Sequence, residues 1–267
     1  MTKLNLIILV SLISLNSFAD STKTNQIVST PKEKSSWSSS IGVAAITNSK
    51  IYQGAKAKSM AIPLITIKKG NFSFEGDKFV YKFLKLGNFT FATNLGYQAK
   101  PYKRKDSTIL QGMEEKKNGA LAYLTTKYKF KSYGVESSIG RVLGQSEQGL
   151  QATLEANYNQ FYPTFLGGML SLKYSLGVDY MDSTRALYVY GVKTSEVNIA
   201  LGRSAYNVGQ TLSPVAKFNT VYIFGAERQW MLLNNFSYQL LDSKIVDSPI
   251  VEEDQVLGFM TGLIRKF

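Results

Sequence analysis

The feature that most constrains the fold of this chain is an alternation of apolar and polar residues with period two. In residues 150–159 one face would carry Leu150, Ala152, Leu154, Ala156 and Tyr158, and the other Gln151, Thr153, Glu155, Asn157 and Asn159. Successive side chains of a β-strand point to opposite faces, so this segment predicts a strand with one apolar and one polar face. Residues 89–98, 166–180 and 230–240 show the same pattern. Such alternation over about ten residues is typical of the strands of a membrane β-barrel.

Weaker alternation predicts further strands. They would cover residues 37–46, 59–69, 72–83, 119–130, 132–143, 186–193 and 214–226. Within 72–83 the apolar face changes from even to odd positions, which predicts a bulge or turn at Glu75-Gly76-Asp77. With a last strand over 256–267 the count is about twelve. Single-chain bacterial barrels have even strand numbers, so ten and fourteen are the alternatives.

The last strand would run to the final residue of the chain. Phe259, Leu263 and Phe267 share one face of it, and we expect them to serve barrel closure and assembly. A soluble domain usually lets its last residues fray. A strand in lipid must instead keep every backbone N–H and C=O paired. Aromatic residues also gather at the ends of the expected strands, where the two interfacial girdles of a barrel would lie. They are Trp37, Phe72, Phe89, Tyr97, Phe130, Tyr158, Tyr180, Trp230, Tyr238 and Phe267.

These patterns predict an all-β fold, a transmembrane antiparallel β-barrel over residues 37–267. The rival is a soluble sandwich or lipocalin-like barrel, which would also alternate but would hide its apolar faces in a core. The beginning of the chain favours export: a short basic start, an apolar run over 4–15 and small residues before Ala19 predict a signal peptide over 1–19. The polar segment 20–36 would be a flexible periplasmic leader. We therefore expect the outer membrane of a Gram-negative bacterium.

The composition narrows the function. Lys and Arg outnumber Asp and Glu by 31 to 19, which favours acidic partners such as anionic lipid headgroups or lipopolysaccharide phosphates. Export argues against nucleic acid. The chain has no histidine and no cysteine, so it lacks the usual general base, the usual nucleophile pairs and the commonest metal ligand. We predict no catalytic, cofactor or metal site. Lys103, Arg104 and Lys105 lie in a charged segment that would be an extracellular loop, either solvated or facing lipopolysaccharide.

The segment Asp247-Ser248-Pro249-Ile250-Val251 lies shortly before the expected closing strand. Together with several other segments, taken in order, it resembles the MipA/OmpV family of outer-membrane proteins, and it is similar to the family's signature turn, which makes it the most specific match. Weaker matches are Ile41-Gly42-Val43, Tyr52-Gln53-Gly54-Ala55, Ile62-Pro63-Leu64, Val178 to Asp182, Tyr188 to Val192 and Ala205 to Gly209. The chain departs from the family at Ala55, where the family has Ser, and at Arg265, where it typically has an aromatic residue.

The resemblance implies a scaffold role in peptidoglycan remodelling. The family takes its name from a member that binds the lytic transglycosylase MltA and links it to a murein synthase. Two alternatives remain: a channel for small, mainly anionic solutes, and a surface adhesion or envelope-stress protein. An enzyme is not expected. For Asp247 to Pro249 we expect a structural turn without a ligand, because Asp and Ser bond to nearby backbone and Pro fixes φ.

Overall fold

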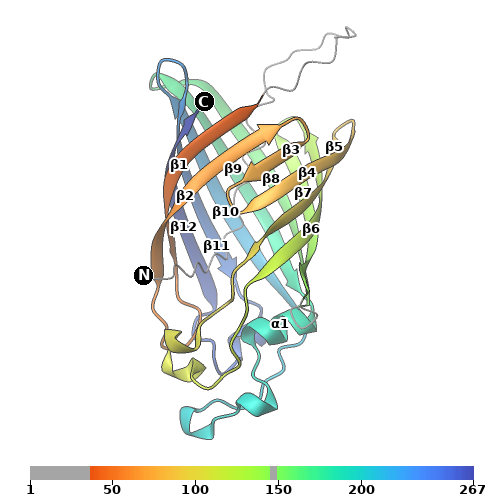
Figure 1. Ribbon diagram of the computed structural model, residues 1–267, viewed down its shortest axis with the longest axis vertical. Coiled ribbons are helices and arrows are strands. Elements are labelled where there is room, and N and C mark those ends of the chain that lie inside the picture. The colour runs from red at the N-terminus through yellow and green to blue at the C-terminus, as the bar shows by residue number, and fades with distance from the viewer. Residues whose placement is uncertain (1–36, 145–148) are drawn as a thin grey trace.

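The computed structural model describes residues 37–144 and 149–267, which form one closed antiparallel barrel of twelve strands (Figure 1). Each strand pairs with its neighbours in the sequence, and the last strand closes the barrel on the first. The strands are β1 (Ser38–Asn48), β2 (Lys58–Lys69), β3 (Phe72–Glu75), β4 (Lys78–Leu86), β5 (Phe89–Gln98), β6 (Gly119–Phe130), β7 (Tyr133–Leu143), β8 (Leu150–Phe165), β9 (Gly168–Met181), β10 (Thr211–Phe224), β11 (Trp230–Leu240) and β12 (Gln255–Lys266). The predicted segments 1–19 and 20–36 lie outside the described residues.

The barrel turns its apolar faces outward and its polar faces inward. On β8 and β9, Leu154 and Leu176 are 51% and 70% exposed, whereas the inward Glu155 and Lys173 are each 8% exposed. A soluble barrel would have the reverse arrangement, because large exposed apolar surfaces are rare in soluble monomers. The membrane barrel is therefore confirmed, and the soluble rival is wrong.

Two details of the strand prediction need correction, although the total of twelve is right. Residues 72–83 form two strands, β3 and β4, separated at Gly76 with φ 77° where the change of face predicted a turn. Residues 186–193 were expected to form a strand but lie mostly in helix α1 (Ser183–Tyr190). The two miscounts cancel. Asp182 precedes the helix as its N-cap: its side chain accepts a hydrogen bond from Arg185 N at 2.6 Å, and such an N-cap favours a helix over a strand.

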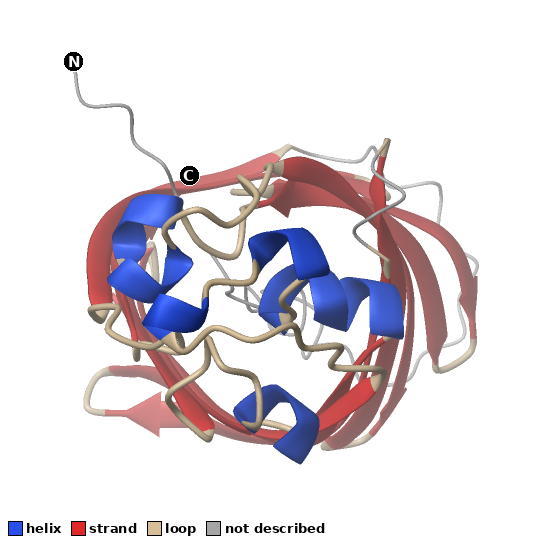
Figure 2. Ribbon diagram, turned by 90° about the horizontal axis from the view of Figure 1, so that it is seen from below, coloured by secondary structure: helices blue, strands red, loops and turns tan. Residues whose placement is uncertain are grey.

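The two ends of the barrel differ in the length of their connections. One end carries both ends of the barrel sequence and the short turns 70–71, 87–88, 131–132, 166–167 and 225–229. The other carries the long loops 49–57, 99–118, 182–210 and 241–254, with α1, α2 (Ser243–Val246) and four 3-10 helices (Figure 2). Bacterial barrels have short periplasmic turns and longer extracellular loops, so we assign the long-loop end to the outside. Within the described ranges, no helix is long and apolar enough to span a membrane.

Candidate functional site

The four long loops fold together into a cap across the outer mouth of the barrel. The cap has an apolar core of its own, in which Leu110, Ile245 and Ile250 are fully buried. The Tyr52 ring meets the Tyr102 ring edge-on at 5.0 Å, and the Tyr52 hydroxyl donates a hydrogen bond to the Val189 carbonyl at 3.1 Å. Figure 2 shows helices and loops lying across the mouth. The outer end of the barrel is therefore closed by packed structure rather than by free loops.

The residues of the family-like turn, Asp247 to Val251, lie within this cap. The Ser248 hydroxyl donates a hydrogen bond to the Tyr190 carbonyl at 2.5 Å. The Ile250 carbonyl accepts one from Gln53 N at 2.9 Å, and Val251 forms a β-bridge with Tyr52. The turn thus joins the first, third and fourth long loops. These contacts are all with the chain itself.

Two buried arginines, which sequence reasoning missed, also organise the cap. Arg203 Nε donates to the Glu196 carbonyl at 2.7 Å, and its guanidinium also donates to the carbonyls of Ile109 and Gln111. Arg185 lies on α1 at the floor of the cap, and burial lowers its pKa. Burial likewise raises the pKa of Tyr52 and raises that of Tyr190 to about 12. Only a long-range fold places these groups in a low-dielectric setting, so the sequence carries no local signal for them.

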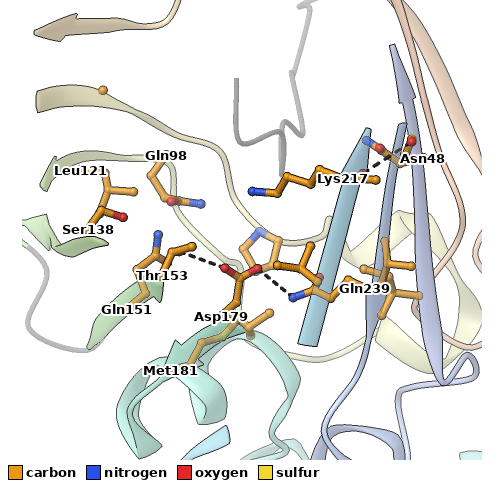
Figure 3. Close-up of a pocket in the computed structure, with 18 of the residues that line it drawn as sticks. Asn48, Gln98, Leu121, Ser138, Gln151, Thr153, Asp179, Met181, Lys217 and Gln239 are labelled. Carbon is orange, nitrogen blue, oxygen red and sulfur yellow. Dashed lines mark hydrogen bonds between the residues drawn. The ribbon is translucent and has the colours of Figure 1, made fainter. Parts of the chain in front are cut away.

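Beneath the cap, the lumen contains a cavity of about 390 Å³ with a polar and charged wall (Figure 3). Glu155 on β8 faces two lysines, with Lys217 Nζ at 2.8 Å and Lys173 Nζ at 3.4 Å from its carboxylate oxygens. Asp179 on β9 accepts hydrogen bonds from Thr153 at 2.9 Å and Gln239 at 3.0 Å. Inward positions of neighbouring strands thus assemble one connected network of charges and amides.

Apolar side chains occupy one side of the lumen next to the cavity. On the β1, β2 and β10 to β12 side, the lumen is filled by an apolar cluster of Ala44, Ile46, Ile62, Leu64, Val221, Leu233, Met260 and Ile264. Val221, Leu233 and Ile264 are at most 2% exposed and do not line the cavity. Gly262 permits this packing, since a Cβ there would lie 3.0 Å from the Ala44 Cβ. The lumen is therefore packed on this side, whereas the facing wall, which includes Glu136 and Lys173, lines the cavity.

The structure places the remaining predicted residues outside this cavity. Phe259 and Leu263 lie on the outward face of β12, and Phe267 directly follows this strand; the three side chains are 42% to 65% exposed. The departure Arg265 stacks its guanidinium over the rings of Trp230, at 5.7 Å, and Phe267, at 5.2 Å. An arginine over interfacial aromatics can extend toward headgroups, which accounts for its place at a membrane boundary.

Lys103, Arg104 and Lys105 lie in the cap, where acidic residues accompany them. Lys103 N donates to an Asp106 carboxylate oxygen at 2.9 Å, and Arg104 Nε lies 3.8 Å from Glu115. The segment is therefore less basic in the fold than its sequence suggests. In the described part of the chain, no group of three or more His, Cys, Asp or Glu side chains could hold a metal ion.

Comparisons with known proteins identify the family of the chain. The sequence profile of the family described as MltA-interacting protein MipA matches residues 41–267. The chain is 25% identical to YiaT of Escherichia coli O157:H7 and of strain K12, whose names designate an outer membrane protein, over 249 residues covering 85% of this chain and 90% of YiaT.

Solved structures similar to the barrel include OmpT of Vibrio cholerae, at 7% identity and a TM-score of 0.34, which covers 88% of this chain and 100% of OmpT. OccAB1 of Acinetobacter baumannii is 10% identical with a TM-score of 0.33, covering 77% of this chain and 65% of OccAB1. Scores this low add nothing to what the strand topology establishes.

Proposed function

Since the chain belongs to the MipA family of outer-membrane β-barrels, we propose that it is a scaffold that brings a murein hydrolase of the MltA type together with a murein synthase. The observation that supports this most is the obstructed lumen: a cap covers the outer mouth, and the apolar cluster fills one side of the interior. A barrel whose interior is packed offers surfaces rather than a passage. Small barrels are often filled by their own side chains.

The periplasmic end has the charge to hold a partner. Its turns and strand ends expose seven cationic side chains, which we call the basic rim: Lys69, Lys85, Lys129, Lys131, Arg228, Arg265 and Lys266. Complementary charge steers association and fixes orientation. A periplasmic enzyme with an acidic face would therefore approach this end, where the short turns extend from the membrane into the periplasm.

Capture from crosslinked envelopes tests the scaffold. A tagged chain at near-native expression is crosslinked in cells, and its partners are identified by mass spectrometry. We expect an MltA-type lytic transglycosylase, and expect the Lys129→Gln/Lys131→Gln variant to capture several-fold less. The matched control, Lys105→Gln/Lys244→Gln at the opposite end, should capture as much as the unaltered chain. Repeated absence of any murein enzyme from the unaltered sample would overturn the proposal.

The runner-up, a channel for small anions, predicts a different result in a planar bilayer. A closed lumen should give no reproducible conductance steps, whereas defined anion-selective steps would favour the channel. Heat-modifiable migration on a detergent gel verifies that the reconstituted protein is folded.

Two further expectations remain proposals. We propose that residues 1–19 are removed as a signal peptide, which the intact mass of the mature protein would test. We also propose that Lys103, Arg104 and Lys105 contact lipopolysaccharide. Replacing all three with Gln should then weaken retention of lipopolysaccharide during purification, and unchanged retention would refute this contact.

A further inference from the structure

The wall of the barrel is incomplete on one side. β2 pairs with β1 along its whole length, from Lys58 to Lys68. On its other edge, however, β3 covers only Thr66 to Lys69. Within the described residues, no strand pairs with this edge between Lys58 and Ile65, and Figure 1 shows the gap beneath the short β3–β4 hairpin. We call this gap the side window.

The side window communicates with the lumen cavity. The cavity wall includes residues from every margin of the gap: Lys58 on β2, Asp77 and Lys78 at the β3–β4 turn, Gln98 at the end of β5, and Asp106 in the next loop. At the lower margin, Lys58 Nζ lies 2.7 Å from the Asp106 carboxylate and links β2 to the cap. The cavity therefore opens sideways, toward the surface that faces lipid.

The open edge cannot be exposed to acyl chains alone. An unpaired backbone group in hydrocarbon costs several kcal/mol, and this edge spans eight residues. Yet the same stretch lies in the apolar band, because Val43, paired with Pro63, is 55% exposed on the outside. Pro63 also fits an edge, since proline cannot donate to a ladder and is confined to edge strands. The edge must therefore face water, a polar headgroup or another strand.

The lysines behind the window can hold an anion. Seven cations line the cavity, Lys50, Lys56, Lys58, Lys78, Lys173, Arg185 and Lys217, with the five carboxylates Asp77, Asp106, Glu136, Glu155 and Asp179. Two of these cations pair with carboxylates outside the lining, Lys50 with Glu252 and Glu253, and Lys78 with Glu75. Lys217 shares Glu155 with Lys173, so one carboxylate serves two ammonium groups. Figure 3 shows Lys217 extending across the cavity toward Gln98. The volume of about 390 Å³ lies within the range of small-ligand pockets.

An apolar groove of about 1110 Å³ begins at the upper margin of the window. Phe74 and Phe79 line it with ring centroids 4.9 Å apart, together with Leu95 and Leu124 on β5 and β6. The window lies nearer the capped end, and Trp37, Lys69 and Phe72 line the other end of the groove, so the groove runs from the window toward the periplasmic end of the barrel. An acyl chain attached to a headgroup in the window would take that course.

We propose that the side window binds an anionic glycerophospholipid, with its phosphate headgroup in the lumen cavity and an acyl chain in the groove. The headgroup would satisfy the open edge of β2, and Lys217 and Lys58 would hold its charge. This binding site goes beyond the scaffold role and does not depend on it.

Thiol labelling tests the route, because the natural chain has no cysteine to interfere. Ser138→Cys places a thiol on the cavity wall, and Ser137→Cys places a matched thiol on the outward face of the same strand. Each variant is reconstituted in phosphatidylcholine vesicles that contain phosphatidylethanolamine with a maleimide on its headgroup. We expect S138C to gain the mass of the lipid several-fold faster than S137C. Labelling of S138C by a water-soluble maleimide but not by the lipid, or by neither, would overturn the proposal.

Lipid selectivity tests the charge. The protein is offered equal amounts of phosphatidic acid and phosphatidylcholine in detergent, and retained lipid is counted by native mass spectrometry. We expect a preference for phosphatidic acid that falls several-fold in Lys217→Gln and persists in Lys244→Gln, a lysine outside the cavity. Heat-modifiable migration confirms folding of each variant. Equal retention of both lipids by the unaltered protein would overturn the proposal, as would a bound peptide in place of lipid.

Discussion

Glu155 holds together the charged network of the lumen, and its removal gives the sharpest test of the closed interior. The Glu155, Lys173 and Lys217 side chains are 10%, 10% and 12% exposed, and the Glu155 carboxylate forms ion pairs with both lysines. Removing one partner of a buried ion pair costs about 3–5 kcal/mol, because the other charge is left uncompensated. Glu155→Gln leaves two lysines without their carboxylate partner. We therefore expect a loss of unfolding free energy at the upper end of that range.

The assay is equilibrium urea unfolding of the protein in detergent micelles, followed by tryptophan fluorescence and gel mobility. Glu227→Gln, in an exposed turn, is the matched control and should change the free energy by less than about 0.5 kcal/mol. The double variant Glu155→Gln/Lys217→Gln should recover part of the loss, because it removes one of the stranded charges. If Glu155→Gln were no worse than the control, the lysines would be hydrated. The lumen would then be water-filled, and the channel would gain over the scaffold.

Three other predictions concern the cap and the closing strand. Ile250→Ala removes a fully buried side chain from the cap core and should lower the stability of the cap by about 2–5 kcal/mol. We expect faster proteolysis of the long loops, while the barrel keeps its heat-modifiable migration on a detergent gel. Alkaline pH should loosen the cap: burial raises the pKa of Tyr52 and Tyr102, and raises that of Tyr190 to about 12. Because these folded-state values exceed the ordinary value near 10, the stabilisation is complete below about pH 10 and is lost as pH rises through 12. Tyrosinate absorbance that titrates in one step near pH 10 would contradict this. Deleting Phe267 should lower the amount of heat-modifiable protein in the outer membrane, if that residue is the assembly signal; an unchanged amount would show that it is not.

The walls of the barrel could be predicted because alternation with period two is a local property. The polar face of each strand in the Glu155 network can be recognised from the sequence. The contact between the charged side chains cannot, because it depends on the register that pairs Glu155 with Gly177 and Lys217 with Ser175. That register is a long-range outcome of packing and loop length. A period-two pattern is also ambiguous over short runs, and for this reason residues 186–193 predict a strand although most of them lie in the helix Ser183–Tyr190.

The cap escaped prediction for a different reason. Leu110, Met113 and Ile245 are fully buried in it, yet Leu110 and Ile245 lie in helices of three and four residues, too short to show a periodicity, and Met113 lies in a loop. Only their convergence at one end of the barrel makes them a core, and that convergence requires the barrel to exist first. The sequence signal for the cap was therefore the length of the loops, not their composition.

The side window and the cap have a common origin in the shortness of β3. A strand of four residues leaves the lower edge of β2 without a partner, so the wall can be completed only from below. The loop after β5 reaches across to do this through the Asp106 carboxylate on Lys58. A full-length β3 would seal the wall, but it would also bury the cationic cavity without access. The predicted change of face at Glu75-Gly76-Asp77 was therefore the one local sign in the sequence of where the barrel opens.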